Sequence, residues 1–285
     1  MCDEFAILRA LRFAVVGHVE WVEFLRVERV PAPGEIARAT DAFEEPAGGG
    51  AVAAVQLARL AGESTLLTAL GDDRLGRASR ERLGALGVEV QAAVRVDATR
   101  RAVTFLDSDG ERTITVIGRR LHADRGDELD WGRLASADGV YFTAGDAGAL
   151  RAAREARVLV ATPRAGDVLG DAGVELDALV YSAEDETESA MAARLEPKPS
   201  LLVATRGAAG GSYVEGEVTG EWPAAGLPGP VEDAYGCGDS FAAGLCFGLA
   251  QGLDPEAAVA LAARAGATCL TGRGPYGRQL TAEDL

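Results

Sequence analysis

Short apolar runs alternate with alanine-, arginine- and glutamate-rich stretches of helical periodicity along most of this chain. The first apolar run is 13–16, and predicted helices at 51–60 and 77–86 enclose a second apolar run at 65–70. Parallel strands need long crossover connections, which are usually helices, so this alternation predicts βαβ units and a mostly parallel sheet. The hydrophobic content of 48% over 285 residues supports a core of the size that such a sheet requires.

The middle and C-terminal parts of the chain continue the same alternation. Strands are predicted at 139–142, 158–161, 178–181, 201–204 and 211–214, and helices at 146–155, 185–195, 239–251 and 255–270. The glycine- and proline-rich stretch 216–230 is expected to form a hairpin and a loop rather than a linker between domains. We therefore expect residues 1–285 to form one α/β domain.

Two stretches, residues 19–45 and 100–117, depart from this pattern because apolar and polar residues alternate in them. A period of two is typical of strands with one buried and one exposed face. The sequence Asp107-Ser-Asp-Gly110 is a turn signal between two such runs. These stretches predict a small antiparallel β-sheet outside the main sheet.

The chain is strongly acidic, with a net charge of −16, and Lys198 is its single lysine. Nucleic-acid binders need clustered basic residues to displace counterions, so the composition argues against a nucleic-acid partner. No apolar run reaches the roughly 18–20 residues of a membrane helix, and the N-terminal Met-Cys-Asp-Glu-Phe lacks the zones of a signal peptide. We therefore expect a cytoplasmic protein without a membrane partner.

A metal centre built on sulfur or imidazole is not expected from the sequence. The cysteines are Cys2, Cys237, Cys246 and Cys269, without a Cys-x-x-Cys pair, and the histidines are His18 and His122. Cys237 lies at a predicted helix start, where a thiolate would be stabilised, so a nucleophilic cysteine is one alternative for this segment.

The segment 233–244 places two glycines and an acidic residue where a loop becomes a helix. Apolar residues recur at helical spacing from Phe241 on, so residues 236–238 fall at the helix start, where backbone N–H groups have no partner. These groups and the helix dipole attract anions, and Asp239 would face the same point. The alternative is that the glycines form a tight turn and that Asp239 only caps the helix.

The order Asp233-Ala-Tyr-Gly-Cys-Gly-Asp239 resembles the C-terminal signature of the ribokinase-like kinases, the PfkB family, whose pattern is Asp-Thr-x-Gly-Ala-Gly-Asp. The resemblance implies a three-layer α/β/α fold with a mostly parallel central sheet and a small antiparallel β lid. In that family the lid covers the substrate and often joins two subunits. The resemblance also implies that Asp239 is the catalytic base and that the N–H groups of Gly236, Cys237 and Gly238 form an anion hole. The family has alanine at the position of Cys237, which argues against a cysteine nucleophile.

Other segments match the family in the same order along the chain. Gly48 and Gly49 correspond to a glycine pair that approaches the phosphoacceptor, and Leu70-Gly-Asp-Asp-Arg-Leu-Gly76 follows at the family's spacing. The nucleotide-binding residues that the resemblance implies are Thr205, Gly207, Ser182 and, in the stretch 263–267, Gly266. Residues 271–274 fall where some members bind a monovalent cation. Without the resemblance, these glycines would indicate only turns or close packing.

Two substitutions set this chain apart from typical sugar kinases. Val22 stands where those kinases hold a substrate-binding aspartate, and Ala53 replaces the asparagine that follows the glycine pair. Neither side chain can bind a hydroxyl, so a plain ribokinase or fructokinase is not expected. Glu20 is a candidate substrate-binding carboxylate, and a solvated strand edge is the alternative for it.

The metal and lid residues also follow from the resemblance. The family's Asn-x-x-Glu, which organises magnesium through water, reads Ser182-Ala-Glu-Asp185 here, so Asp185 and Glu184 are the candidate metal residues. Arg112 matches the Gly-Glu-Arg turn of the lid and is expected to stabilise the hairpin rather than to contact the substrate.

Two other phosphate-binding folds do not fit the sequence. The single lysine is not preceded by the glycine loop of P-loop enzymes, and Gly17-His-Val-Glu lacks the Gly-x-Gly-x-x-Gly of dinucleotide-binding folds. We therefore predict an ATP- and Mg²⁺-dependent kinase that phosphorylates a hydroxyl of a sugar, a modified sugar or a nucleoside. A non-catalytic binding or regulatory protein of the same fold is the alternative, since Val22 and Ala53 have lost the sugar-binding groups.

Overall fold

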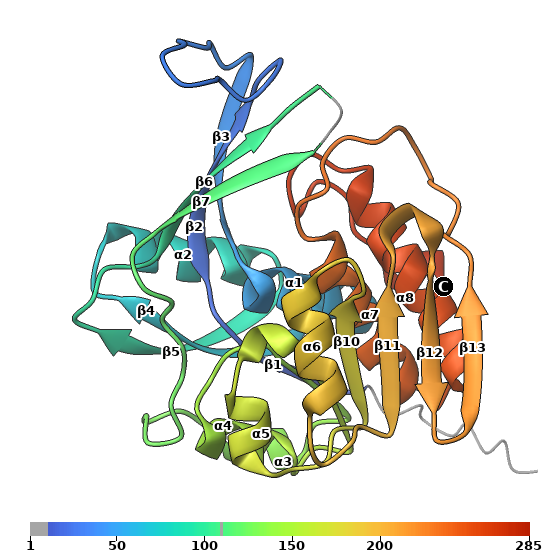
Figure 1. The fold of residues 1–285 in the computed structure, drawn as a ribbon. Helices are drawn as coiled ribbons and strands as arrows, with labels where there is room; N and C mark the ends of the chain where they lie inside the picture. The colour runs from blue at the N-terminus through green and yellow to red at the C-terminus, as the bar shows by residue number, and fades with distance from the viewer. Residues whose placement is uncertain (1–10, 109–110) are drawn as a thin grey trace, which may run out of the picture.

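A nine-stranded, mostly parallel sheet runs through the centre of the protein (Figure 1). The structure is a computed structural model and describes residues 11–108 and 111–285. The strands lie in the order β13 (Val218–Trp222), β12 (Gly211–Glu215), β11 (Leu201–Thr205), β10 (Ala178–Ser182), β9 (Val158–Ala161), β8 (Gly139–Phe142), β1 (Phe13–Val16), β4 (Ser64–Gly71) and β5 (Val88–Arg95). All neighbours from β11 to β5 pair in parallel, and β12 and β13 extend one edge as antiparallel strands. The predicted α/β class is confirmed.

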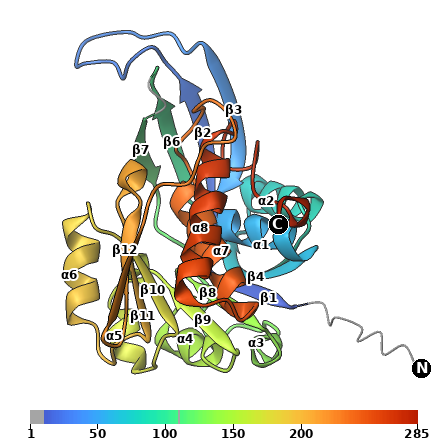
Figure 2. The same cartoon turned by 90° about the vertical axis from the view of Figure 1, so that its right-hand side faces the viewer.

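Helices cover both faces of this sheet in a three-layer α/β/α arrangement (Figure 2). One face carries α1 (Gly49–Ala61), α7 (Cys237–Ala250) and α8 (Pro255–Leu270), and the other carries α4 (Ala147–Ala153), α5 (Val168–Ala172) and α6 (Glu186–Arg194). The helix α2 (Arg74–Ala85) packs beside β4 and β5, and the short α3 (Gly132–Ala135) packs beside α4.

In β1, Phe13 and Val15 belong to one buried cluster, whereas Ala14 and Val16 belong to the other. Successive side chains of a strand point to opposite faces, so a strand covered on both sides is apolar throughout.

A second, four-stranded sheet rises from one end of the main sheet, and we call it the lid (Figure 1). Its strands lie in the order β3 (Asp41–Ala47), β2 (Glu20–Arg26), β6 (Arg101–Leu106) and β7 (Arg112–Ile117), within or next to the predicted stretches. The two outer pairings are antiparallel, as predicted, but the central pair of β2 and β6 is parallel. The reason is topological: β2 follows β1 and β6 follows β5, two strands that leave the same end of the parallel sheet.

The predicted lid turn is closed by a side chain. The Glu111 backbone N–H donates to Asp107 Oδ1 at 3.0 Å, and the Asp107 N–H donates to the Glu111 carbonyl at 3.1 Å, so both bonds join the ends of β6 and β7. Asp109 and Gly110, the other residues of the turn signal, lie outside the described residues, as do residues 1–10 with Cys2.

Most predicted element boundaries lie within three residues of those in the structure. The helix α7 begins at Cys237, two residues before its predicted start, because Gly236 adopts φ 84° and ends the preceding loop. The strand β5 has no counterpart among the predicted strands, since its sequence mixes polar and apolar residues at the edge of the sheet. Within the part of the chain that the structure describes, no helix is both long and apolar enough to cross a bilayer.

Candidate active site

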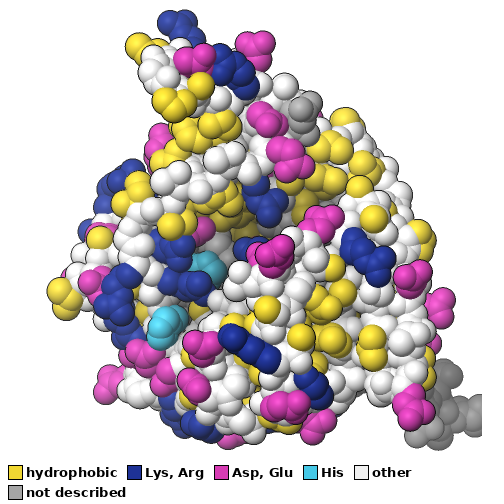
Figure 3. Space-filling model, viewed as in Figure 1, with side chains coloured by type: hydrophobic (Ala, Val, Ile, Leu, Met, Phe, Trp, Pro, Cys, Tyr) yellow, Lys and Arg dark blue, Asp and Glu magenta, His cyan; other side chains and the backbone are white. Residues whose placement is uncertain are grey.

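A cavity of about 100 Å³ lies where the lid meets the body of the protein. The lid contributes Glu20, Arg112 and Ile114 to its wall, and the body contributes His18, Gly48, Gly49, Thr143, Arg164, Tyr235, Gly236 and Asp239. His18, Thr143 and Arg164 follow β1, β8 and β9 closely, so the wall is built at the carboxyl ends of parallel strands, where α/β sheets usually bind ligands. Figure 3 shows a hollow beneath the lid with Lys and Arg side chains gathered around it.

Asp239 lies in the first turn of α7 and lines the cavity. The N-cap of α7 is Gly236, without a side-chain capping bond, so the alternative in which Asp239 only caps the helix is wrong. Burial raises the pKa of Asp239, and the opposing charges of Arg164 and Arg112 do not cancel this rise. A carboxylate with a raised pKa binds a proton more readily than an exposed one, as a general base must.

The residues of the predicted anion hole surround the start of α7. The first N–H groups of an α-helix have no partner inside the helix. A Cβ added at Gly238 would meet no atom within 4 Å, so the backbone at Gly238 borders open space. At Gly236 a Cβ would lie 2.9 Å from Val52 Cγ1, and φ is 84°, so this position requires glycine. The geometry fits an anion held by the amides of residues 236–238.

The glycine pair at the start of α1 lies against Asp239, as the sequence predicts for a substrate-side segment. A Cβ on Gly49 would lie 2.9 Å from Asp239 Oδ1 and 3.2 Å from Thr143 Oγ1. Gly48 has φ 89° and lies against the side chains of His18 and Glu20. Glycine at these positions lets the backbone of α1 approach the Asp239 carboxylate, which no side chain would allow.

Glu20 is buried in the cavity wall, with a hydrogen bond at one carboxylate oxygen and an ion-pair contact at the other. The Tyr235 hydroxyl donates to Glu20 Oε1 at 3.1 Å and accepts from the Gly48 N–H at 3.2 Å. Arg100 Nε lies 3.0 Å from Glu20 Oε2. The alternative interpretation, in which Glu20 lies on a solvated strand edge, is therefore wrong. The Glu20 side chain connects the lid, Gly48 of the glycine pair and Tyr235 of the signature segment 233–239.

Val22 and Ala53 lie in the hydrophobic core and do not line the cavity. Both are fully buried within the same cluster of apolar side chains. The positions at which typical sugar kinases carry polar substrate-binding groups are therefore sealed by packing in this chain.

Two arginines, Arg112 and Arg164, line the cavity, and two more, Arg100 and Arg120, contact residues of its wall; of the four, only Arg112 was identified from the sequence. Arg164 Nε donates to Glu188 Oε1 at 2.8 Å, Arg120 Nη1 donates to the Arg164 carbonyl at 2.7 Å, and Arg100 pairs with Glu20. Arg112 lines the cavity and donates to the Ala234 carbonyl at 2.7 Å, across the gap between β7 and the signature loop. The expectation that Arg112 stabilises its own hairpin is thus wrong. Arg164 could have been found from its position after a predicted strand, but Arg100 and Arg120 stand in no motif.

The arginine charges influence each other and the acidic groups beside them. Burial and the nearby charges of Arg100 and Arg164 lower the pKa of Arg120. At Arg164 burial alone would lower the pKa, but the charges of Asp239 and Glu188 outweigh it and raise the pKa. The cavity is therefore a place where positive charge gathers close to the Asp239 carboxylate.

Three of the predicted nucleotide residues come together beside the active-site end of the sheet. Ser182 and Thr205 are register partners at the carboxyl ends of β10 and β11. Gly207 begins the 3₁₀ turn η2 (Gly207–Ala209) with φ 52° and has open space around its Cα. Gly266 differs, because a Cβ on it would lie 3.2 Å from the Cys237 carbonyl oxygen, so this glycine allows α8 to pack closely on α7.

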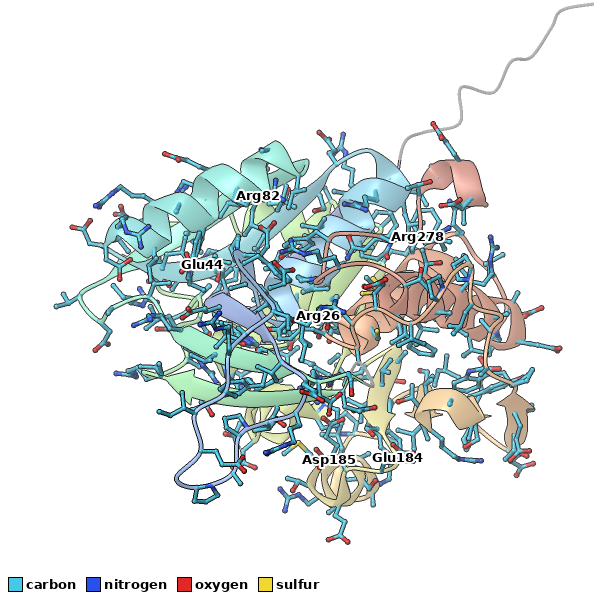
Figure 4. All side chains as sticks on the ribbon, turned by 90° about the horizontal axis from the view of Figure 1, so that it is seen from above. Arg26, Glu44, Arg82, Glu184, Asp185 and Arg278 are labelled. Atoms are coloured by element: carbon cyan, nitrogen blue, oxygen red, sulfur yellow. The ribbon has the colours of Figure 1, made fainter. Side chains whose placement is uncertain are left out.

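The candidate metal carboxylates follow β10, and Figure 4 shows Glu184 and Asp185 side by side at the start of α6. Asp185 Oδ1 accepts from the N–H groups of Thr187 and Glu188, so it caps α6. The carboxylate that reaches the cavity arginines is instead Glu188, which is nearly buried and also accepts from the Ser182 N–H at 2.9 Å. In the described ranges no three His, Cys, Asp or Glu side chains are grouped closely enough to hold a metal by themselves.

The loop 271–274 lies next to the signature. Asp233 is fully buried and accepts from the N–H groups of Tyr235 at 2.8 Å and Gly274 at 3.1 Å. Burial raises the pKa of Asp233 to about 6. The loop that the family resemblance links to a monovalent cation is thus in contact with the signature segment.

The thiol of Cys237 is not activated. A hydrogen bond with Cys269, together with burial, raises the pKa of Cys237 well above its usual range. A protonated thiol is a poor nucleophile, so the alternative of a reactive thiolate at this helix start is wrong.

Comparisons with known proteins agree with this geometry. The chain matches the sequence model of the pfkB family carbohydrate kinases over residues 11–168 and 173–281. It is 32% identical over 254 residues to an ATP-dependent ribose-1-phosphate kinase of Halopiger xanaduensis, which covers 82% of this chain and 83% of that protein. It is also 32% identical over 257 residues to a fructokinase of Klebsiella pneumoniae, covering 76% and 81%. The structure of Arabidopsis thaliana ribokinase complexed with ribose and ATP has a TM-score of 0.77 at 21% identity and covers 96% of this chain and 97% of that one.

Proposed function

Because the chain belongs to the pfkB family of carbohydrate kinases, and is therefore a phosphotransferase, we propose that its acceptor is a sugar that already carries a phosphate group. The γ-phosphoryl group of ATP would be transferred to a hydroxyl of that sugar phosphate. The observation that carries this proposal is the group of arginines at the cavity, namely Arg100, Arg112, Arg120 and Arg164. The relative from Halopiger xanaduensis, a ribose-1-phosphate kinase, supports a pentose phosphate in particular.

Two of these arginines are not held by a carboxylate in the part of the chain that the structure describes. Arg112 and Arg120 donate to carbonyl groups and form no ion pair within residues 11–108 and 111–285. The lowered pKa of Arg120 means that its charge is disfavoured where it stands, and a bound phosphate would relieve this. Arginine suits that task because its planar fork of donors matches phosphate oxygens.

We assign the chemical step to Asp239 and the start of α7. Asp239 accepts the proton of the attacking hydroxyl, which its raised pKa favours. The N–H groups of Gly236, Cys237 and Gly238 stabilise the charge on the transferred phosphoryl group. Closure of the lid over the cavity keeps water from competing with the acceptor.

The nucleotide would lie beside Ser182, Thr205 and Gly207 with its γ-phosphate at Gly238, where the backbone borders open space. Asp185 and Glu184 are the residues that we propose to hold magnesium through water, since both are exposed carboxylates next to this site. Bound magnesium would neutralise part of the phosphate charge.

The test compares acceptors in pairs that differ only by a phosphate. We expect ATP turnover with magnesium to be at least 100-fold more efficient, in kcat/KM, for pentose 1- or 5-phosphates than for the unphosphorylated pentoses, because each charge-assisted contact contributes roughly 1.5–3 kcal/mol. ADP release and product mass are the readouts. Equal efficiency within each pair would contradict the proposal.

A matched pair of variants links this preference to the cavity. Arg120→Gln should raise the KM for the phosphorylated acceptor about 10- to 100-fold and leave the KM for ATP unchanged. The neighbouring Arg119 is exposed and pairs with Asp97 at 3.4 Å, so Arg119→Gln should change neither. A loss of ATP affinity in Arg120→Gln would place this arginine on the nucleotide instead.

We also propose that the lid joins two subunits, because its edge strand β7 exposes Ile114, Val116 and Ile117 at 40%, 49% and 45%. An apolar sheet edge of this kind is usually covered in solution. Light scattering should give twice the chain mass of 29.5 kDa, and Val116→Asp should return the monomer. Val218→Asp, on the edge strand β13 of the main sheet, is the control and should stay dimeric. A monomeric wild type at micromolar concentration would refute this contact.

A further inference from the structure

His18 lines the cavity just after β1, and the hydrogen-bonding capacity of its ring is unused. Its Nδ1 is shielded from solvent and has no hydrogen-bond partner in the described part of the molecule. A Cβ on Gly48 would lie 3.0 Å from both Cδ2 and Nε2 of His18, so the imidazole is packed against the glycine pair. The ring is therefore held in place, with Nε2 on the side of the residues that approach Asp239.

The surroundings of His18 keep the ring neutral. The charged groups that face it are Arg100 and Arg120 next to the lid strands, with Glu20 paired to Arg100, and Arg164 and His122 from the body. Burial, followed by the positive charges of Arg120, Arg100 and Arg164, lowers the pKa of His18 to about 3. A neutral imidazole has one N–H donor and one acceptor nitrogen.

The position of the single proton follows from the burial of Nδ1. A buried N–H group without a partner is rare and costly, so the proton is better placed on Nε2 than on the shielded Nδ1. The side chain then offers an N–H donor on the side of Gly48, within the wall of the cavity.

Thr143 also lines the cavity, and its buried hydroxyl has no hydrogen-bond partner among the described residues, whereas the positions that bind hydroxyls in typical sugar kinases are engaged or apolar. Glu20 is bound by Tyr235 and Arg100, and Val22 and Ala53 are sealed in the core. His18 retains a donor that no described residue uses.

We propose that His18 is a specificity-determining residue, which donates a hydrogen bond from Nε2 to one hydroxyl oxygen of the acceptor while a second hydroxyl lies at Asp239. The inference rests on the proposed kinase function and adds to it a rule for choosing among sugars. An acceptor that lacks the hydroxyl facing His18 would leave the imidazole N–H unpaired, which reduces its affinity.

Three substitutions separate this role from mere packing. His18→Gln places an amide NH₂ near the position of Nε2, His18→Asn places it nearer to Nδ1, and His18→Leu removes the donor at similar volume. We expect the acceptor KM to rise about 5- to 100-fold in His18→Leu and His18→Asn, and clearly less in His18→Gln. The KM for ATP should stay unchanged in all three. Arg119→Gln, at an exposed side chain that pairs with Asp97, is the control and should behave as the wild type.

Monodeoxy acceptors identify the partner hydroxyl. In the wild type, removing one particular hydroxyl should cost as much as His18→Leu does, and the two losses should not add when combined. The ratio of the acceptor KM values of His18→Leu and wild type should stay constant from pH 5.5 to 8, because the ring remains neutral. A ratio that changes around the ordinary histidine pKa would show that the ring titrates and would overturn the assignment of a neutral donor.

The outcomes distinguish the two proposals. A wild type that turns over no acceptor in the panel would refute the proposed function itself. An active wild type whose acceptor KM is unchanged in His18→Leu, or whose losses add with every deoxy acceptor, would refute only the role of His18.

Discussion

Replacing Asp239 by asparagine is expected to lower kcat by about 10²- to 10⁴-fold while leaving ATP binding intact. The carboxylate lies against the glycine pair at the start of α1, where the attacking hydroxyl would have to lose its proton. Asparagine keeps the shape of the side chain but cannot accept that proton. Steady-state turnover and ATP binding by calorimetry, on the same preparations, measure both effects.

The stability of Asp239→Asn gives an independent check. Burial raises the pKa of Asp239 in the folded protein, so the ionised carboxylate disfavours folding, and this penalty grows as the pH rises above the ordinary aspartate value. The variant should therefore be at least as stable as the wild type at pH 7, and the difference should shrink on acidification.

A capping aspartate provides the matched control for this prediction. Asp254 is the N-cap of α8 and accepts from the Ala257 N–H at 2.8 Å. Asp254→Ala should lose about 1 kcal/mol of unfolding free energy and keep full turnover, the opposite pattern. A variant Asp239→Asn with wild-type kcat would exclude Asp239 as the base.

Replacing Arg164 by glutamine is expected to have the second-largest effect, a loss of about 100-fold or more in kcat/KM for the acceptor. The charge of Arg164 offsets two carboxylates, Asp239 and Glu188, and the residue lines the cavity. Its removal takes away one contact to the acceptor phosphate and also a positive charge beside the catalytic base. Each of these losses is worth roughly tenfold or more by itself.

The pH profile shows which part of the loss is electrostatic. The charge of Arg164 lowers the pKa of Asp239, so without it that pKa rises further. The acidic limb of the kcat profile of Arg164→Gln should therefore shift to higher pH. Arg164→Lys keeps the charge and should leave the limb in place, although it loses the Nε bond to Glu188.

A surface arginine serves as the control for Arg164. Arg194 on α6 is exposed and pairs weakly with Asp167 at 3.4 Å, so Arg194→Gln should change neither the profile nor the stability. In Arg164→Gln the nearly buried Glu188 loses its partner, which should lower the unfolding free energy by roughly 1–2 kcal/mol. An unshifted acidic limb would mean that Arg164 does not act on the base.

Much of the fold could be predicted from the sequence because the polarity pattern of each segment matched the burial of its faces in the structure. The strand β1 is apolar at every position because helices cover both faces of the sheet, and the one-by-one alternation in β2 reflects a lid strand with one buried face. The elements without a predicted counterpart include the short helices α3 and α5 and the edge strand β5, in which the alternation of apolar and polar residues was not recognised.

Backbone chemistry made part of the active site predictable as well. Gly236, with its positive φ, Gly49, against Asp239, and the start of α7 are recognisable because their conformations and close approaches require particular residues within a few positions of one another. When the residues concerned lie only a few positions apart, their spacing in the sequence already determines their relative positions in the structure.

Only the tertiary structure decided what surrounds that catalytic centre. Arg100 and Arg120 flank the lid strands and Arg164 follows β9, yet all three act on His18 and belong to no common motif. The parallel pairing of β2 with β6 and the carboxyl ends of β1, β8 and β9 bring them together. The protonation state and the hydrogen bonds of a side chain depend on its burial and on its distance from other charged and polar groups. For residues that lie far apart in the sequence, the fold sets these distances, and the spacing along the chain does not reveal them.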